Sequence, residues 1–494
     1  MRLRVAAATA AAVAFFLTWL AARRFLPSND EGIFLDGAVR ILRGEVPYRD
    51  FFILMGPGTF WLQAVALKAF GVSLAASRIV PVAGLSLTAG CIAWILARWT
   101  HPLYAAWVAI VTIFLEISDP AATLVNHRAD SAALAILAAT ALLARKPLAS
   151  GVCAGFAAWV TPSVALVAIA LLGWLLLRER SQVARFLFGV AGVSAICAAV
   201  LAEQGALAPM IQHMLWTGRN YGAANSMFYG SRLGGYATFF EGASPTDLLP
   251  RLLVVLALTM PAILPLAALA LSRRRAAREN REVTLLLVAG WALLLAAYPR
   301  FDVPHLACAL PLFCAIVGFH AFHFKRARAA AFAAVCLMAI LPVGYQVYLR
   351  ARMIRIETRV GEVVATPEDA ALIDAVEQQV GRGDSVFCFP YLPIFYFLTL
   401  GENPTRFSYL QPGMMSDADE ALALGELQAR PPGKILYQDV GPEMILRIWP
   451  ASDPARLRMR RIETFVSGNY RLKSKLRYQN AEVEILEPSA VSGQ

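Results

Sequence analysis

The sequence predicts an α-helical polytopic membrane protein with a small C-terminal α/β soluble domain. Two features of the composition support this prediction: 58% of the 494 residues are hydrophobic while only 16% are charged, and the mean hydropathy is +0.56. A third observation is the order of these segments along the chain. Apolar runs follow one another up to residue 348, and a mixed, more polar composition comes after them. One soluble core cannot bury so much apolar surface, so we expect many membrane-spanning helices.

Apolar runs bounded by charged residues predict about eleven transmembrane helices. The first run follows Arg2 and Arg4; it has features of a cleavable signal peptide, but its length favours a membrane span. The stretch 151–177 contains Thr161-Pro162, which could kink one helix or separate two, and the basic loops downstream favour two. The predicted spans are 5–22, 78–97, 103–117, 129–144, 148–161, 163–177, 186–202, 250–271, 283–298, 304–320 and 329–348.

The basic residues lie in short clusters between these runs, and this distribution predicts the topology. When the spans alternate from a cytoplasmic N-terminus, every strong basic cluster falls on the cytoplasmic side, as the positive-inside rule requires. Topology therefore explains most of the net charge of +11, and we expect no nucleic-acid partner. The segments expected outside the cytoplasm are 23–77, 118–128, 203–249, 299–303 and 349–494.

The chain is expected to divide into a membrane domain, 1–348, and a soluble domain, 349–494. Within the second, Thr366-Pro367 followed by two acidic residues is typical of a helix start. The patterns at 385–389 and 481–486 predict strands. A small α/β domain outside the cytoplasm is the expected result.

The long first external segment of the membrane domain, 23–77, is expected to contain helices rather than a simple turn. Its apolar stretch 51–67 is broken by Gly56-Pro57-Gly58, which is typical of helices lying along the membrane surface. Acidic and basic residues alternate in this segment, and ion pairs between them would hold such helices together. These residues are Asp36, Arg40, Arg43, Glu45, Arg49 and Asp50.

An adjacent pair of carboxylates, Asp30-Glu31, lies just past the first apolar run. A carboxylate at such a boundary can reach both a lipid-borne and a soluble substrate. The block that starts there continues with G-x-x-P-Y-R-D-F and P-G, and it resembles the bacterial GT-C glycosyltransferases of the membrane mannosyl- and aminoarabinosyltransferase type, which are family 39-like. The resemblance continues in order through 70–78, 128–130, 151–162, 298–305 and 396–406.

The resemblance implies a GT-C fold and an inverting transfer of one sugar from a polyprenyl-phosphate carrier to an acceptor hydroxyl. The acceptor would be a cell-envelope glycan, a lipid or a protein on the outer face of the bacterial cytoplasmic membrane. Membrane lipid, the lipid-linked sugar and this acceptor are the expected partners. Two other classes stay open: a transporter or flippase of lipid-linked sugars, and a non-catalytic membrane protein that binds glycans.

The resemblance also implies the catalytic residues. Asp30 matches the family's catalytic carboxylate and would take the proton of the acceptor, because a hydroxyl nucleophile needs a base. Glu31 would orient Asp30 or share its proton, and Asp130 would be the second acidic residue of the site. Taken alone, Asp30-Glu31 could be a solvated boundary pair, and Asp130 could cap its helix or pair with Arg128.

The leaving group in such a transfer is a lipid phosphate, whose charge needs cationic donors. Arg78, Arg128, Arg300 and His305 are the candidates because they stand at predicted outer helix ends, and Tyr48 is a further candidate for substrate binding. Helix-end anchoring and contacts with lipid headgroups are the alternatives for these residues. Thr161 stands where related sequences often carry Lys, which shifts weight to Arg300 and His305.

Neither a metal nor another cofactor is expected, although the resemblance leaves open one divalent ion held by the external acidic residues, as in some GT-C enzymes. Six of the seven cysteines lie in apolar runs, and no C-x-x-C or His/Asp cluster with ligand spacing occurs in the sequence. The lipid-linked sugar would be a substrate rather than a cofactor.

Overall fold

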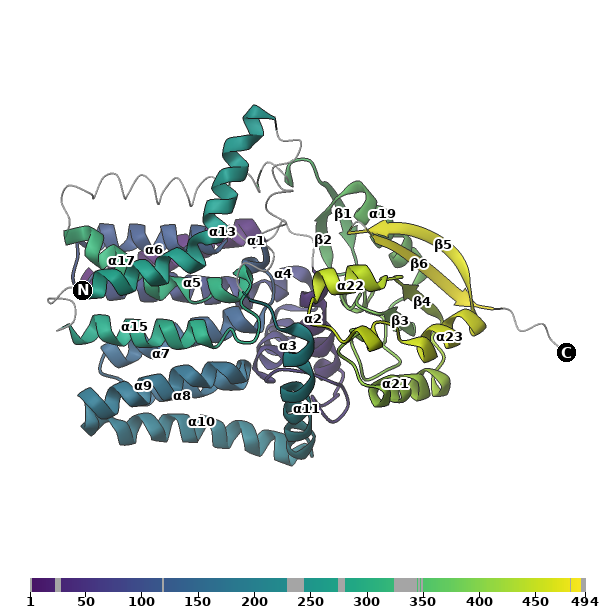
Figure 1. Ribbon diagram of the computed structural model, residues 1–494, viewed down its shortest axis with the longest axis horizontal. Coiled ribbons are helices and arrows are strands. Elements are labelled where there is room, and N and C mark those ends of the chain that lie inside the picture. The colour runs from purple at the N-terminus through teal and green to yellow at the C-terminus, as the bar shows by residue number, and fades with distance from the viewer. Residues whose placement is uncertain are drawn as a thin grey trace. The chain divides into compact units, whose positions relative to one another are not determined.

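A computed structural model describes residues 2–22, 28–117, 120–228, 244–273, 280–323, 350–479 and 481–489, with the single positions 344 and 347. The chain packs into two compact units (Figure 1). The helical unit comprises Met1–Ala22, Arg78–Val200 and Phe228–Ala351, and the mixed unit comprises Arg23–Ser77, Leu201–Met227 and Arg352–Gln494. The first predicted external segment therefore packs with the C-terminal residues.

The helical unit is a bundle in which most helices run alongside one another (Figure 1). Each predicted apolar run up to 304–320 coincides with described helix, and the last of these is divided between two helices. The predicted span 329–348 lies outside the described residues except for its positions 344 and 347. The helices are α1 (Arg2–Ala22), α5 (Ile79–Leu96), α6 (Pro102–Glu116), α7 (His127–Leu143), α8 (Pro147–Val160), α9 (Ala165–Arg178), α10 (Val183–Glu203), α13 (Pro245–Ser272), α15 (Arg281–Leu295), α16 (Val303–Ala307) and α17 (Leu310–His323).

The outward surface of this bundle is apolar, as lipid requires. Phe188 and Ile196 on α10, and Leu177 on α9, are large side chains that are mostly exposed. By length and composition, three stretches of the described residues can cross a membrane, namely Arg2–Ala22, Leu74–Leu96 and Arg180–Glu203. The apolar helices between them are shorter.

Thr161 separates α8 from α9, so the stretch 151–177 forms two helices, as predicted. The backbone of Thr161 is extended (φ −134°, ψ 107°), and Pro162 starts a short 3-10 turn before α9. Small residues then let α8 approach α10 closely. A Cβ atom on Gly151 would lie 2.0 Å from the carbonyl oxygen of Phe186, and one on Gly189 would lie 2.3 Å from that of Leu148. Close backbone contact of this kind is a common way for membrane helices to associate.

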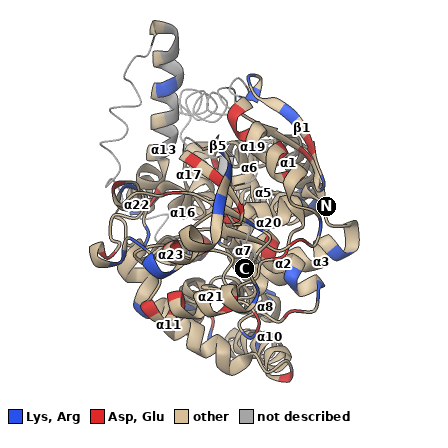
Figure 2. Ribbon diagram, turned by 90° about the vertical axis from the view of Figure 1, so that its right-hand side faces the viewer, with Lys and Arg blue, Asp and Glu red and all other residues tan. Residues whose placement is uncertain are grey.

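The mixed unit contains a four-stranded sheet in the order β3-β4-β6-β5 and a separate hairpin, β1-β2. β3 and β4 are parallel, while β4, β6 and β5 are antiparallel neighbours. Figure 2 colours the charged residues of this unit, and several pair across the β5-β6 hairpin, including Lys475 with Glu482 at 2.7 Å. The strands are β1 (Ile354–Thr358), β2 (Gly361–Ala365), β3 (Val386–Phe389), β4 (Lys434–Tyr437), β5 (Tyr470–Tyr478) and β6 (Ala481–Pro488).

The helices of the mixed unit come from three separate parts of the chain. Two predictions are confirmed here: α19 starts at Pro367 with the Thr366 side chain accepting a hydrogen bond from the backbone of Asp369, and β3 and β6 occupy the expected stretches. The helix α11 and the hairpin β1-β2 have no counterpart in the sequence prediction. The helices are α2 (Asn29–Leu42), α3 (Gly58–Phe70), α4 (Leu74–Ser77), α11 (Leu207–Asn225), α19 (Pro367–Gln379), α20 (Ile394–Thr399), α21 (Asp417–Ala429), α22 (Pro442–Ile448) and α23 (Arg460–Asn469).

The contact between α8 and α10 gives a test with a matched control on one helix. We expect Gly189→Ala to destabilise the protein by about 1–3 kcal/mol, because the added methyl group meets backbone that must shift. A methyl group added at Gly192 would have no atom within 4 Å, so Gly192→Ala should be neutral or stabilising by roughly 0.5–1 kcal/mol. Thermal unfolding of the detergent-purified variants measures both effects, and equal melting temperatures would contradict the packing described.

Candidate functional site

The N-terminal turn of α2 carries Asp30 and Glu31. Ser28 caps this helix, because its side chain accepts a hydrogen bond of 3.2 Å from the backbone N–H of Glu31. The positive end of the helix dipole favours both carboxylates at this position. Asp30 is exposed, whereas Glu31 is fully buried. The two neighbouring carboxylates therefore have different environments, and Asp30 is the one that solutes can reach.

Tyr391 holds the Asp30 carboxylate from the C-terminal part of the mixed unit. Its hydroxyl donates a hydrogen bond of 2.7 Å to Asp30 Oδ1, which leaves Oδ2 as the oxygen for other partners. The Tyr391 ring in turn packs edge-on against Tyr409 and Trp449, at centroid distances of 4.9 and 5.4 Å. Aromatic side chains thus fix the position of the hydroxyl group that orients Asp30.

A glycine allows this arrangement. The Cβ atom of any other residue at position 32 would lie 2.2 Å from the backbone nitrogen of Ile394, the first residue of α20. Helix α2 therefore packs directly against the start of α20, just after Tyr391 in the chain. This contact brings together Asp30 and Tyr391, which are 361 positions apart in the sequence.

Further along α2, polar side chains hold the helix in the mixed unit. Ser408 donates a hydrogen bond of 2.6 Å to Asp36, and Arg40 pairs with Glu45 at 2.7 Å while its Nη1 donates to the Thr405 carbonyl. The prediction of ion pairs within this segment is thus confirmed for Arg40 with Glu45 and for Arg49 with Asp50, the latter at 2.8 Å. Arg43 instead donates to the carbonyl of Leu400 at 3.1 Å.

Asp36 has an unusual pKa for an aspartate. Burial is the largest influence and raises its pKa, while the charge of Arg40 and the hydrogen bond from Ser408 lower it by less, so the net shift is upward. Ionisation of Asp36 therefore opposes folding, and its contacts indicate a structural role.

Helix α11 also belongs to the mixed unit, where His213 and Trp216 pack on Phe52 at centroid distances of 4.8 and 5.0 Å. Burial, with a smaller contribution from the charge of Arg406, lowers the pKa of His213 to about 4. The imidazole is therefore neutral at physiological pH. Tyr48 is fully buried in this region and its hydroxyl donates to the Met55 carbonyl at 2.7 Å, so its role in substrate binding stays a prediction.

In the helical unit, Asp302 links Arg300 and His305 at the start of α16. Its side chain accepts from Arg300 Nε at 2.6 Å and from the backbone N–H of His305 at 3.3 Å, and it also contacts His305 Nδ1. Burial alone would raise the pKa of Asp302, but the hydrogen bond from His305 and the charges of His305 and Arg300 lower it overall. The Asp302 carboxylate is therefore ionised. Because it contacts Nδ1 of His305, the other ring nitrogen of that histidine, Nε2, can bind a further partner.

Arg128 lies at the start of α7, where its charge interacts with His305 and His127. Its Nη1 donates to the Ala296 carbonyl at 3.3 Å, and its buried Nε has no partner among the described residues. The neighbouring Thr161 donates its hydroxyl to the His127 carbonyl at 3.1 Å and accepts from the His127 ring at 2.8 Å. Arg128 thus has unused donors close to the Arg300–Asp302–His305 group.

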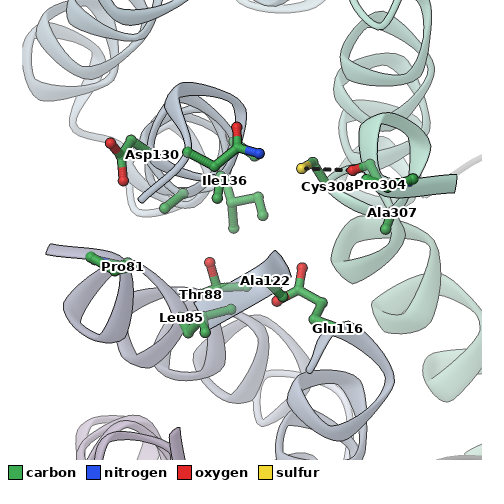
Figure 3. A pocket seen from close by; sticks show the side chains of 15 residues that line it. Pro81, Leu85, Thr88, Glu116, Ala122, Asp130, Ile136, Pro304, Ala307 and Cys308 are labelled. Carbon is green, nitrogen blue, oxygen red and sulfur yellow. Dashed lines mark hydrogen bonds between the residues drawn. The ribbon is translucent and has the colours of Figure 1, made fainter. Parts of the chain in front are cut away.

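Asp130 and Glu116 line one cavity of the helical unit (Figure 3). Asp130 is in the first turn of α7 and only 5% exposed, and Glu116 is the last residue of α6 and 9% exposed. Figure 3 shows Asp130 and Glu116 on different walls of the cavity. Arg78 is also buried, at 2% exposed, where α5 begins, and its contact with a substrate stays a prediction.

The structure therefore groups Arg128, Arg300 and His305 in the helical unit and Asp30 with Glu31 in the mixed unit. Sequence reasoning missed Tyr391 and Glu116. No sequence signal connects Tyr391 to Asp30, whereas Glu116 could have been noticed as a lone acid at the end of an apolar run. The described residues contain no group of three or more His, Cys, Asp or Glu that could hold a metal ion.

Comparison with known proteins identifies similar solved structures but no matching family model or curated protein. No protein-family model and no curated protein matches the chain. The fold is similar to that of ArnT from Cupriavidus metallidurans bound to undecaprenyl phosphate, with a TM-score of 0.57, 12% identity and coverage of 99% of both chains. It is also similar to the apo oligosaccharyltransferase of Archaeoglobus fulgidus, with a TM-score of 0.54, 11% identity and coverage of 90% of this chain and 72% of that one.

The raised pKa of Asp36 predicts a pH-dependent stability difference. The contribution of Asp36 to the stability of the wild type falls as the pH rises from about 4, the ordinary pKa of an unfolded aspartate, through its higher folded pKa, because the ionised form is the less favourable one in the fold. Asp36→Asn keeps an acceptor for Ser408 and has no such cost. Its melting temperature relative to wild type should therefore increase with pH across this window, as measured by thermal unfolding between pH 4 and 8; a decrease would contradict the assigned direction.

Proposed function

We propose that this chain, which has the fold of the GT-C membrane glycosyltransferases, is an inverting transferase that moves a sugar from a polyprenyl-phosphate carrier to an acceptor hydroxyl. The observation that carries the proposal is the similarity to ArnT over 99% of both chains, because that structure contains undecaprenyl phosphate. The reaction would take place on the outer face of a bacterial cytoplasmic membrane. The acceptor would be a glycan, lipid or protein of the cell envelope.

Asp30 is proposed as the base. It is the exposed member of the carboxylate pair, and Tyr391 binds only its Oδ1. In a single displacement, the acceptor oxygen attacks the anomeric carbon while its proton passes to Asp30, and the bond between that carbon and the phosphate oxygen breaks. Attack from the face opposite the leaving group inverts the configuration. Glu31, buried next to Asp30, would support it.

The leaving lipid phosphate takes the electron pair of the broken bond and needs cationic partners. Arg128 has donors that the described residues do not use, and Arg300 and His305 lie in the same part of the helical unit. Asp302 holds both Arg300 and His305, so their positions are set before a phosphate binds. Asp130 has no part in this proposed phosphate contact because it carries the same sign of charge.

A transporter or flippase would move the lipid-linked sugar without breaking its bond to phosphate. Formation of a glycosylated acceptor and free polyprenyl phosphate by the purified protein would therefore support the transferase over this alternative. A non-catalytic glycan-binding protein would produce neither product.

Asp30→Asn should reduce kcat by about 10²- to 10⁴-fold, the usual contribution of a general base. Tyr391→Phe should cause a smaller loss, about tenfold, because it removes one hydrogen bond to a charged group. The matched control is Asp36→Asn, which removes a carboxylate from the same helix and should keep the activity. Transfer is measured with purified enzyme and a radiolabelled lipid-linked sugar; full activity of Asp30→Asn would overturn the assignment of the base.

Arg128→Ala should weaken the binding of undecaprenyl phosphate by about 10- to 100-fold, which corresponds to the loss of one charge-assisted hydrogen bond. Arg98→Ala is the control, because Arg98 also belongs to the helical unit but pairs with Glu282 on α15. Binding to the detergent-purified protein can be measured by native mass spectrometry. If both variants bind the lipid as wild type does, Arg128 does not contact the phosphate.

A further inference from the structure

The helical unit contains a cavity of about 50 Å³ whose ligand the proposed chemistry does not specify. Its walls come from α5, α6, α7, α16 and the short turn before α7, and most of the lining is apolar. The polar side chains around it are Thr88, Glu116, Asn126 and Asp130, with the thiol of Cys308 at one side (Figure 3).

Glu116 is the side chain that points to a ligand. It is nine-tenths buried, it lines the cavity, and its Oε2 has no hydrogen-bond partner among the described residues. A buried carboxylate oxygen without a partner is costly, and the cost increases near hydrocarbon. A bound group that donates a hydrogen bond would remove this cost.

The lining restricts the chemical class of that group. The lining contains no Lys, Arg or His, so the cavity offers no cationic partner to the phosphate of a lipid carrier. The described acidic residues do not converge into a group that could hold a metal ion. The small volume admits part of a sugar rather than a whole ring together with its carrier. A sugar edge fits these properties, because hydroxyl groups donate to carboxylates and the C–H face packs on apolar walls.

We propose that this cavity is a subsite for the transferred sugar, in which Glu116 accepts a hydrogen bond from one of its hydroxyl groups. The inference rests on the proposed transferase function and adds a residue that selects the donor. A site built to bind a hydroxyl discriminates against a ligand that lacks it, because its buried acceptor is then left unpaired. Glu116 therefore favours the sugar-bearing carrier over the bare carrier.

The test compares the two kinds of lipid on the same protein. The probes are undecaprenyl phosphate and undecaprenyl phosphate carrying mannose, glucose or arabinose, with binding measured by native mass spectrometry. We expect wild type to bind at least one sugar-bearing lipid about tenfold or more tightly than the bare carrier. Glu116→Ala should abolish this preference and leave the affinity for undecaprenyl phosphate within about twofold.

Thr112→Val is the matched control, one turn earlier on α6. The Thr112 hydroxyl donates to the Val108 carbonyl at 2.8 Å and does not line the cavity, so this variant should keep the preference. A second readout uses wild type alone and covers the case in which Glu116→Ala fails to fold. Cys308 lines the same cavity, and the preferred sugar-bearing lipid should slow its reaction with methyl methanethiosulfonate more than the bare carrier does.

The outcomes separate this inference from the function on which it rests. If wild type binds undecaprenyl phosphate but none of the sugar-bearing lipids more tightly, the sugar subsite is overturned while lipid-phosphate binding stands. The subsite is also overturned if folded Glu116→Ala keeps the preference, or if both lipids protect Cys308 equally. If wild type binds no polyprenyl phosphate at all, the proposed function fails and the subsite fails with it.

Discussion

The mixed unit depends on the direct contact between the backbone of α2 at Gly32 and the start of α20 at Ile394. No side chain can occupy the space between these two segments. The contact fixes the axis and the rotation of α2, so the first turn of that helix presents Asp30 to Tyr391 and buries Glu31. A larger residue at position 32 would separate α2 from α20 and remove the support of both carboxylates at once.

In each unit, one charged side chain interacts with several polar groups at once. Asp302 serves two basic side chains and a backbone N–H, and Arg40 serves Glu45, the Thr405 carbonyl and the face of Phe51, which lies 5.0 Å away. Each arrangement satisfies several polar groups with one side chain, which limits the desolvation cost. Glu116 differs from this pattern because its Oε2 has no partner among the described residues.

Much of the architecture follows from local sequence. Lipid makes apolar runs obligatory, so the helices of the described bundle coincide with such runs, and the cap at Thr366 identifies α19. Features that depend on tertiary packing had no comparable signal in the sequence. The amphipathic α11 lacks the length of apolar sequence that marks a span, and its position depends on packing against Phe52. The pairing of Asp30 with Tyr391 depends on a contact between segments that are distant in the chain.

The candidate site also has features that local sequence predicts and features that depend on tertiary packing. A boundary carboxylate and basic helix ends can be recognised from the sequence, which is why Asp30, Arg128, Arg300 and His305 were predicted, but their burial and partners could not be. Asp302 was visible in the sequence only as part of a short turn, whereas the structure gives it the central position among these charges.

The glycines of α8 and α10 have a consequence for how lipids reach the protein. Because backbone meets backbone at Gly151 and Gly189, and Gly155 lies against the backbone of Val190, no gap exists there for an acyl or polyprenyl chain. Opening one would require the two helices to separate along their whole contact. This flank of the bundle is therefore a wall that is closed to acyl and polyprenyl chains.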